Sequence, residues 1–155
     1  MKENINKIRI IFMGTSSFAD VILNALIEEK CNIIGVFTQP DKKTGRTQIF
    51  QKNIVKITAE KNDLNIFQPE KFDDAAILEL KNLEPDLIIV AAYGKILPQK
   101  VLEIPKYKCL NVHASLLPKY RGPSPVQNVI LNGEKETGIT IILMNENVDT
   151  GDILS

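Results

Sequence analysis

The sequence predicts an α/β domain built on a mostly parallel β-sheet with helices on both faces. Three observations support this fold class. Short apolar runs rich in β-branched residues recur along the chain, stretches with helical spacing separate them, and the composition is that of a soluble globular domain. The chain has 155 residues, of which 44% are hydrophobic and 25% charged. Such a length buries about 70% of the unfolded surface, enough for one core, so we expect one domain.

Five apolar runs are the candidate strands. They are residues 8–13, 33–37, 87–91, 109–112 and 139–144. Each is too continuous for a strand with one face in water, so we expect central parallel strands that are buried on both faces. The longest unbroken apolar run covers residues 87–93 and is far shorter than the ~20 residues that cross a bilayer.

Between these runs the apolar spacing becomes that of an amphipathic helix. The stripes with this spacing are Phe18, Val21, Ile22, Ala25 and Leu26; Ala76, Ile77, Leu80 and Leu83; and Val126, Val129 and Ile130. For the last helix, Ser124 is the expected N-cap, Pro125 the first helical residue and Gly133 the exit. A further helix is expected over residues 53–61.

Two stretches interrupt this alternation. Residues 39–51 have no apolar period and predict an exposed loop, whereas residues 116–125 hold three prolines and Gly122 and predict a rigid loop. The chain stops at Ser155 just as residues 152–154 begin to look like another strand, so we expect a truncated domain.

Charge and cysteine content exclude several classes of protein. The 19 basic and 19 acidic residues cancel, which disfavours a sequence-independent nucleic-acid binder but leaves a local basic patch open. Cys31 and Cys109 have no metal-binding or disulfide spacing and are expected to be reduced thiols. With His113 as the only histidine, a multi-histidine metal site is excluded. The first residues show no signal peptide, so we expect a cytoplasmic protein.

Ligands of open parallel sheets bind beyond the carboxyl ends of the strands, where the strand order switches. This rule selects the segments after residues 13, 37, 91, 112 and 144. The first of them, residues 14–17, offers backbone N–H groups for an anion at a helix start. It matches neither of the glycine-rich nucleotide motifs, so a tight strand-to-helix turn is the simpler interpretation.

Polar side chains gather at the fourth run. Asn111 and His113 are two residues apart and are expected side by side, ~6.6 Å apart, where an amide and an imidazole would suit a developing oxyanion. Cys109 is a rival nucleophile, but a strand would hold it ~13 Å from His113. Ser115 lacks the G-x-S-x-G context of a serine hydrolase. A polar residue that is merely satisfied by hydrogen bonds stays an alternative for His113.

The residues alone leave the role of two further polar segments undecided. Asp149 and Asp152 follow the last run and either orient His113 and move a proton or form an Asx-type turn with Gly151. Around Asp41 there is a local excess of basic residues, namely Lys42, Lys43, Arg46 and Lys52. Solvated surface is the ordinary explanation for such an excess.

Together these segments resemble a known family. Residues 111–122 (NVHASLLPKYRG) and 148–152 (VDTGD) are similar to the formyltransferases that use 10-formyltetrahydrofolate. Supporting segments are residues 12–15 with 18–19, 38–41 with 45–46, 91–94, 96–98 and 137–140. The similarity runs from about residue 7 to the end and is greatest to members that formylate methionyl initiator tRNA at the start of translation.

The resemblance implies a Rossmann-like formyltransferase domain over residues 1–155, incomplete at its C-terminal end and without the β-barrel domain of full-length members. The matching positions are Asn111, His113 and Asp149 for the catalytic triad, Ser115, Leu116, Leu117 and Pro118 for the folate loop, and Lys42, Lys43 and Arg46 for an insertion that approaches the tRNA acceptor end. The implied substrates are 10-formyltetrahydrofolate and methionyl initiator tRNA, with no metal and no membrane. A monomer is expected.

One position departs from the family pattern, because Thr47 stands where a second glycine commonly follows the loop arginine. Related family members keep the chemistry and change the acceptor, which is glycinamide ribonucleotide, an amino-sugar nucleotide or, in a hydrolase of the folate, water. The insertion at residues 39–46 and the sequence of residues 148–152 favour the tRNA acceptor. A non-catalytic, folate-binding fragment is the alternative from a different class.

Overall fold

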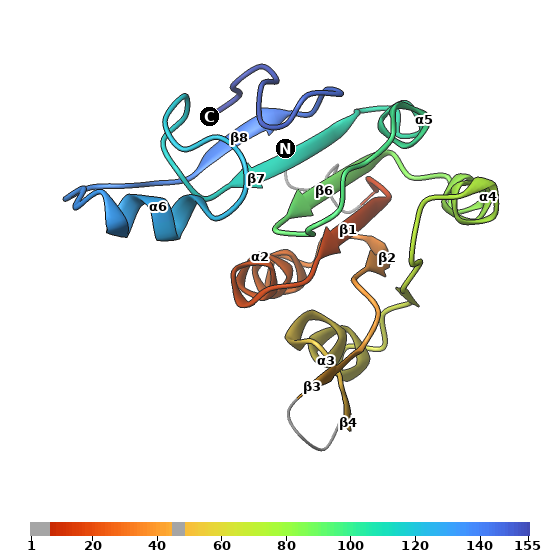
Figure 1. Ribbon diagram of the computed structural model, residues 1–155. Helices are drawn as coiled ribbons and strands as arrows, with labels where there is room; N and C mark the ends of the chain where they lie inside the picture. The colour runs from red at the N-terminus through yellow and green to blue at the C-terminus, as the bar shows by residue number, and fades with distance from the viewer. Residues whose placement is uncertain (1–6, 45–48) are drawn as a thin grey trace.

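The computed structural model describes residues 7–44 and 49–155 and has the predicted architecture of a mostly parallel sheet between helices (Figure 1). The sheet order is β5-β2-β1-β6-β7-β8. Its strands are β1 (Ile10–Gly14), β2 (Ile33–Phe37), β5 (Ile66–Phe67), β6 (Leu87–Ala91), β7 (Cys109–His113) and β8 (Thr140–Leu143). The chain leaves β1 toward β2 and β5 and returns to β6 on the other side of β1, so the strand order switches between β1 and β6.

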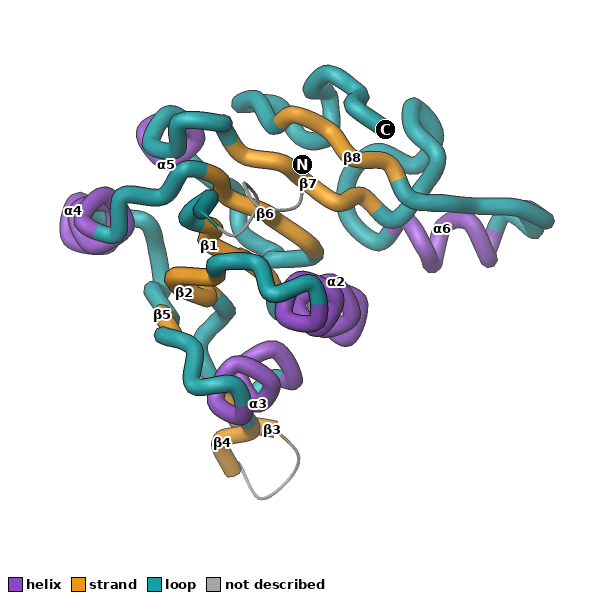
Figure 2. The backbone as a smooth tube through the Cα atoms, turned by 180° about the vertical axis from the view of Figure 1, so that it is seen from behind, coloured by secondary structure: helices purple, strands orange, loops and turns teal. Residues whose placement is uncertain are grey.

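Helices cover both faces of the sheet (Figures 1 and 2). They are α2 (Ser17–Glu28), α3 (Ile54–Lys61), α4 (Asp74–Asn82), α5 (Gln99–Leu102) and α6 (Pro125–Leu131). Helices α2 and α3 lie on one face, α4 and α5 lie on the other, and α6 lies beside β7 and β8. Polar side chains cap three of them, because Ser16, Asn53 and Asp73 each accept a hydrogen bond from the backbone N–H three residues later.

The helices pack on the sheet through two apolar clusters, and the central strands contribute side chains to both. Ile11 and Met13 of β1 pack with the residues of α4 and α5, whereas Phe12 between them packs with α2 and α3. Successive strand residues point to opposite faces, so a strand covered on both sides needs apolar residues at every position. This explains the unbroken runs in the sequence.

A polar clamp joins the start of β1 to the start of β6. The backbone N–H of Arg9 donates to Asp86 Oδ2 (2.8 Å), and its guanidinium donates to the carbonyl oxygens of Leu83 (2.8 Å) and Glu84 (3.0 Å). The backbone N–H of Asp86 in turn donates to the Arg9 carbonyl oxygen. The clamp fixes the central strand pair at the end of the sheet away from the predicted site.

Several sequence predictions need correction. The expected loop at residues 39–51 contains an antiparallel pair, β3 (Lys42–Thr44) and β4 (Ile49–Gln51), which lies outside the main sheet. Strand β8 is antiparallel to β7, not parallel, because an apolar run carries no information on strand direction. Residue Ser124 precedes α6 as expected, but it is left-handed (φ 61°) and its side chain makes no capping hydrogen bond.

Besides β3 and β4, two further elements were not predicted, β5 and α5. Each is too short to show a period in the sequence. Within the described ranges no helix has both the length and the apolar character needed to cross a membrane.

Candidate active site

The predicted catalytic residues meet at the carboxyl end of β7. Asn111 and His113 lie on the same side of this strand, and the Asp149 carboxylate reaches both of them. Asn111 Nδ2 donates to Asp149 Oδ1 (2.9 Å), and Asp149 Oδ2 lies 3.4 Å from His113 Nδ1. The backbone N–H of Gly122 also donates to Asp149 Oδ2 (2.9 Å). One carboxylate therefore joins three segments of the chain.

The route of Asp149 to this place is indirect. Because β8 is antiparallel, Leu143 at its end lies opposite Leu110, near the start of β7. The chain then turns back, and Ile153 forms a bridge with Ile142 on the outer edge of β8. The return is tight at Gly151, where a Cβ atom would overlap the Leu143 carbonyl oxygen, and Asp149 itself is left-handed (φ 50°).

The hydrogen bonds around His113 determine where its protons lie. Its Nε2 is 2.9 Å from the Tyr120 carbonyl oxygen, which only accepts, so Nε2 must carry a hydrogen. Its Nδ1 faces the Asp149 carboxylate, which also only accepts when ionised. The buried His113 side chain therefore lies between two acceptor groups, which fix the orientation of the ring.

The predicted folate loop has an inner and an outer side. Ser115 is buried, and its hydroxyl donates to the Lys119 carbonyl oxygen (2.8 Å), so this side chain supports the loop from within. Leu116 is 51% exposed and, with Leu117 and Pro118, lines a hollow of about 290 Å³. The rest of this lining is Lys119, Tyr120, Glu134, Glu136 and Thr137, so the hollow has one apolar and one polar side and includes none of the predicted catalytic residues.

Thr140 of β8 holds this loop against the sheet. Its hydroxyl donates to the Ser115 carbonyl oxygen (2.7 Å) and accepts from the Leu117 backbone N–H (3.0 Å). Thr140 also lies opposite His113 in the β7–β8 register. The folate loop and the histidine are therefore positioned by the same strand pair.

Two of the predicted tRNA-binding residues, Lys42 and Lys43, belong to β3 of the hairpin β3–β4, which projects beyond α3 (Figures 1 and 2). Lys42 is exposed at the start of β3, and Lys43 is the next residue of that strand. Arg46 and Thr47 lie outside the described residues. The structure thus puts the hairpin away from Asn111 and His113, in a separate part of the molecule.

Two alternative sites gain no support. Cys109 is buried, its Sγ lies 4.0 Å from the Leu102 carbonyl oxygen, and burial raises the pKa of its thiol to about 12, so it is a poor nucleophile. In the turn after β1, a Cβ atom on Gly14 would lie 2.6 Å from Ala19 Cβ and 2.9 Å from the Ala91 carbonyl oxygen. The glycine is required by close packing, as expected for a tight turn.

Sequence reasoning missed three contributors to the site. The Tyr120 carbonyl and the Gly122 N–H are backbone groups, which no side-chain pattern reveals. Tyr120 and Gly122 both have positive φ angles, 59° and 88°, so an unusual backbone directs these groups at His113 and Asp149. Thr140 belongs to the segment 137–140, and this likeness to the family was the only signal for it.

Comparisons with known proteins identify relatives of the whole chain. The family model described as formyl transferase matches residues 6–155. A curated methionyl-tRNA formyltransferase from Halalkalibacterium halodurans is 53% identical over 148 residues, which are 95% of this chain and 47% of the relative. One from Campylobacter curvus is also 53% identical, over 94% of this chain and 48% of the relative. The chain thus spans about half the length of the curated relatives it matches.

Solved structures give the same fold at lower identity. A phosphoribosylglycinamide formyltransferase from Bacillus halodurans is 20% identical and superposes with a TM-score of 0.75 over 95% of this chain and 77% of its own. A formyltetrahydrofolate deformylase from Pseudomonas syringae pv. tomato is 22% identical, with a TM-score of 0.67 over 96% of this chain and 49% of its own. At these identities the likeness concerns the fold alone.

Proposed function

Because the chain belongs to the formyl transferase family, we propose that it transfers a formyl group from 10-formyltetrahydrofolate to the amino group of methionyl initiator tRNA. Asn111, His113 and Asp149 are the catalytic residues of this proposal. The observation that carries it is the Asp149 carboxylate bonded to Asn111 and facing His113 at the end of a buried strand. The curated relatives at about 50% identity favour the tRNA as acceptor over glycinamide ribonucleotide, an amino-sugar nucleotide or water.

The first step is attack of the amine nitrogen on the formyl carbon. The C=O electron pair moves onto oxygen, and the negative charge needs hydrogen-bond donors. In the described part of the chain, one N–H of Asn111 Nδ2 is bonded to Asp149, which leaves the second N–H for this oxygen. The Nε2–H of His113 is a further donor for the same oxygen once it leaves the Tyr120 carbonyl.

The second step breaks the bond between the formyl carbon and the folate nitrogen. The attacking nitrogen loses a proton, the oxygen re-forms its double bond, and the folate nitrogen leaves with the C–N electron pair and takes up a proton. Asp149 assists as an acceptor that passes the proton through a water molecule. The carboxylate also keeps the His113 ring oriented, which is the role that its contacts with Asn111 and Gly122 support.

The two substrates are assigned to separate parts of the chain. The donor folate is proposed to bind at Ser115, Leu116, Leu117 and Pro118, with Leu116 as the exposed apolar contact. The acceptor tRNA is proposed to contact the hairpin through Lys42, Lys43 and Arg46. A cytoplasmic monomer needing no metal completes the proposal.

The test is formyl transfer from 10-formyltetrahydrofolate to methionyl initiator tRNA by this chain and by Asn111→Asp. The variant keeps the shape, removes both N–H groups and places a second carboxylate against Asp149 Oδ1, so we expect a rate loss of about 10²- to 10³-fold with donor binding retained. An exposed asparagine changed in the same way, Asn132→Asp, is the control. Unchanged transfer by Asn111→Asp contradicts the oxyanion role, and formate release without an amine identifies a hydrolase instead. Binding of the folate without any transfer identifies the non-catalytic fragment.

A further inference from the structure

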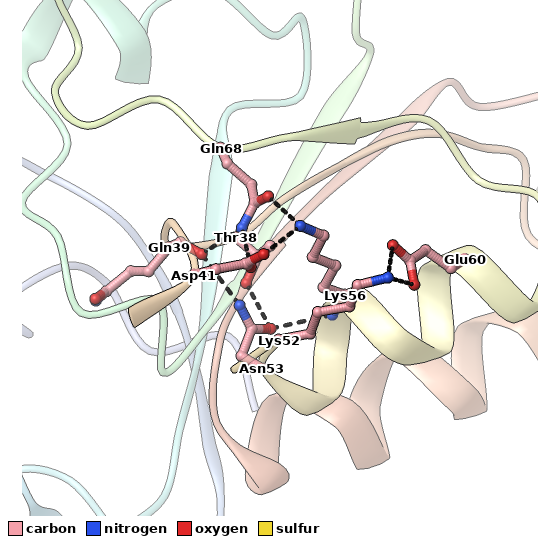
Figure 3. Close-up of polar contacts among 8 residues, drawn as sticks. All are labelled: Thr38, Gln39, Asp41, Lys52, Asn53, Lys56, Glu60 and Gln68. Atoms are coloured by element: carbon pink, nitrogen blue, oxygen red, sulfur yellow. Dashed lines mark hydrogen bonds and ion pairs between the residues drawn. The ribbon is translucent and has the colours of Figure 1, made fainter. Parts of the chain in front are cut away.

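A second polar cluster lies at the same edge of the sheet, beyond β2 and β5 (Figure 3). Its centre is a ring of three side chains, Asp41, Lys56 and Gln68. Lys56 Nζ donates to Asp41 Oδ2 (2.6 Å) and to Gln68 Oε1 (2.8 Å), and Gln68 Nε2 donates to Asp41 Oδ1 (3.0 Å). Only 16% of the Lys56 side chain and 22% of the Asp41 side chain are exposed. The hydrogen bonds close on themselves, unlike those of a surface ion pair.

The ring joins three segments that are distant in sequence. Asp41 directly precedes β3, Lys56 lies in the first turn of α3, and Gln68 directly follows β5. Gln68 Nε2 and Asn53 Nδ2 both donate to the Gln39 carbonyl oxygen, at 2.8 and 3.1 Å. Both ends of the β3–β4 hairpin are thereby tied to α3 and to the edge of the sheet.

Gln39 extends this network to the point where the strand order switches. Its Nε2 donates to the Tyr93 carbonyl oxygen (2.9 Å), which also accepts from Thr15 Oγ1 (3.1 Å). Thr15 follows β1 and Tyr93 follows β6. A continuous set of hydrogen bonds therefore runs from the base of the hairpin to the loops that follow β1 and β6, at the carboxyl ends of the central strands.

The ring also changes the charge of the hairpin. Asp41 is the one acidic residue among residues 39–52, which contain four basic residues. Lys56 from α3 pairs with Asp41, and the hydrogen bonds from Lys56 and Gln68 hold the pKa of the Asp41 carboxyl below its ordinary value of 3.8. Lys52 is also paired, to Glu60 at 2.8 Å. By sequence, residues 39–52 carry a formal charge of +3, from four basic residues and one acidic residue, which suits a phosphate backbone.

We infer that Asp41, Lys56 and Gln68 are positioning residues that fix the β3–β4 hairpin for the acceptor RNA. The inference rests on the proposed function, because it assigns to this ring the orientation of the surface that meets the tRNA. The ring holds the hairpin in place before the RNA arrives, so less conformational freedom is lost on binding.

Two variants separate positioning from charge. Asp41→Asn keeps the size and makes the hairpin more positive, but its NH₂ group faces a donor, either Lys56 Nζ or Gln68 Nε2, so the ring no longer closes. Lys56→Met removes the ammonium group. Lys52→Met is the matched control, since it removes one lysine four residues away that pairs with Glu60 outside the ring.

The experiment measures binding of methionyl initiator tRNA to the chain at fixed salt, together with titration of a stable 10-formyltetrahydrofolate analogue. We expect Asp41→Asn and Lys56→Met to weaken tRNA binding about ten- to a hundredfold, with folate binding unchanged. Lys52→Met should change tRNA binding less than Lys56→Met. Equal or tighter tRNA binding by Asp41→Asn, or an equal loss in both lysine variants, overturns the inference.

Hydrogen exchange of the β3–β4 amides provides a readout that does not need RNA. We expect both ring variants to lower protection in β3 and β4 and to leave the central strands β1 and β6 protected. If the unmodified chain binds no tRNA, the tRNA contact proposed for this chain fails, and the exchange data alone decide on the ring. Unchanged protection in β3 and β4 then overturns it.

Discussion

The two polar clusters at this edge of the sheet are built in opposite ways. In the ring of Asp41, Lys56 and Gln68 the three contacts that close the ring are between 2.6 and 3.0 Å, and each joins two side chains. Around His113 the contact with Asp149 is longer, 3.4 Å, and backbone groups in left-handed conformations complete the cluster. A closed set of hydrogen bonds fixes a position, whereas unusual backbone and unused donors are typical of a place where a ligand completes the bonding.

Asp149→Asn is expected to have the largest effect, because it changes the group at the centre of the His113 cluster. Asn111 Nδ2 donates to one carboxylate oxygen and the Gly122 N–H donates to the other, so an NH₂ group at either position must face a donor. We expect a fall of about 10²- to 10⁴-fold in single-turnover formyl transfer. Asp152→Asn, at an exposed carboxylate three residues later, is the control. A fall of less than about tenfold contradicts the assigned role.

Thr140→Val tests the support that the His113 cluster receives from β8. The valine keeps the shape but leaves the Ser115 carbonyl and the Leu117 N–H without the hydroxyl that bonds both. We expect the free energy of unfolding to fall by about 1–3 kcal/mol, measured by denaturant titration. Thr137→Val, at an exposed threonine, should change stability by less than about 0.5 kcal/mol. Equal effects of the two changes would show that Thr140 does not hold the loop.

Acid titration measures how much the Asp41 carboxylate of the ring contributes to stability. The pKa of Asp41 is lowered in the folded chain, mainly by the hydrogen bond from Lys56, so its ionised form stabilises the fold above pH 3.8. This contribution is lost as the pH falls below 3.8 through the lower pKa of the folded state. We expect the stability difference between the unmodified chain and Asp41→Asn to be constant above about pH 5 and to shrink below pH 3.8. A difference that does not change with pH contradicts the assignment.

The sequence was sufficient for the parallel part of the sheet because burial on both faces leaves a signal in every residue of a strand. The runs at 33–37 and 87–91 coincide with β2 and β6. Strand direction leaves no such signal, which is why the antiparallel pairing of β8 was missed. The turn that returns Asp149 to β7 depends on that direction, so spacing alone could not locate the carboxylate.

The ring was invisible to sequence reasoning for a related reason. Asp41, Lys56 and Gln68 lie in no common motif, and each of them alone is an ordinary polar residue. Only the crossover from β2 through α3 to β5 brings them together. Asn111 and His113, in contrast, are two residues apart on one strand, so strand geometry alone predicted their proximity.

The position of β1 between β2 and β6 has a consequence for the order of folding. Ile10 pairs with Ile33 on one side, 23 residues away, and with Leu87 on the other, 77 residues away. Closing the longer loop costs about 1 kcal/mol more entropy than closing the shorter one. Pairing of β1 with β2 therefore needs a shorter loop than pairing of β1 with β6, and the Arg9–Asp86 clamp needs the longer one. The hairpin lies in the part of the chain that closes by shorter loops, so we expect the surface proposed for the RNA to form at a lower entropy cost than the site of chemistry.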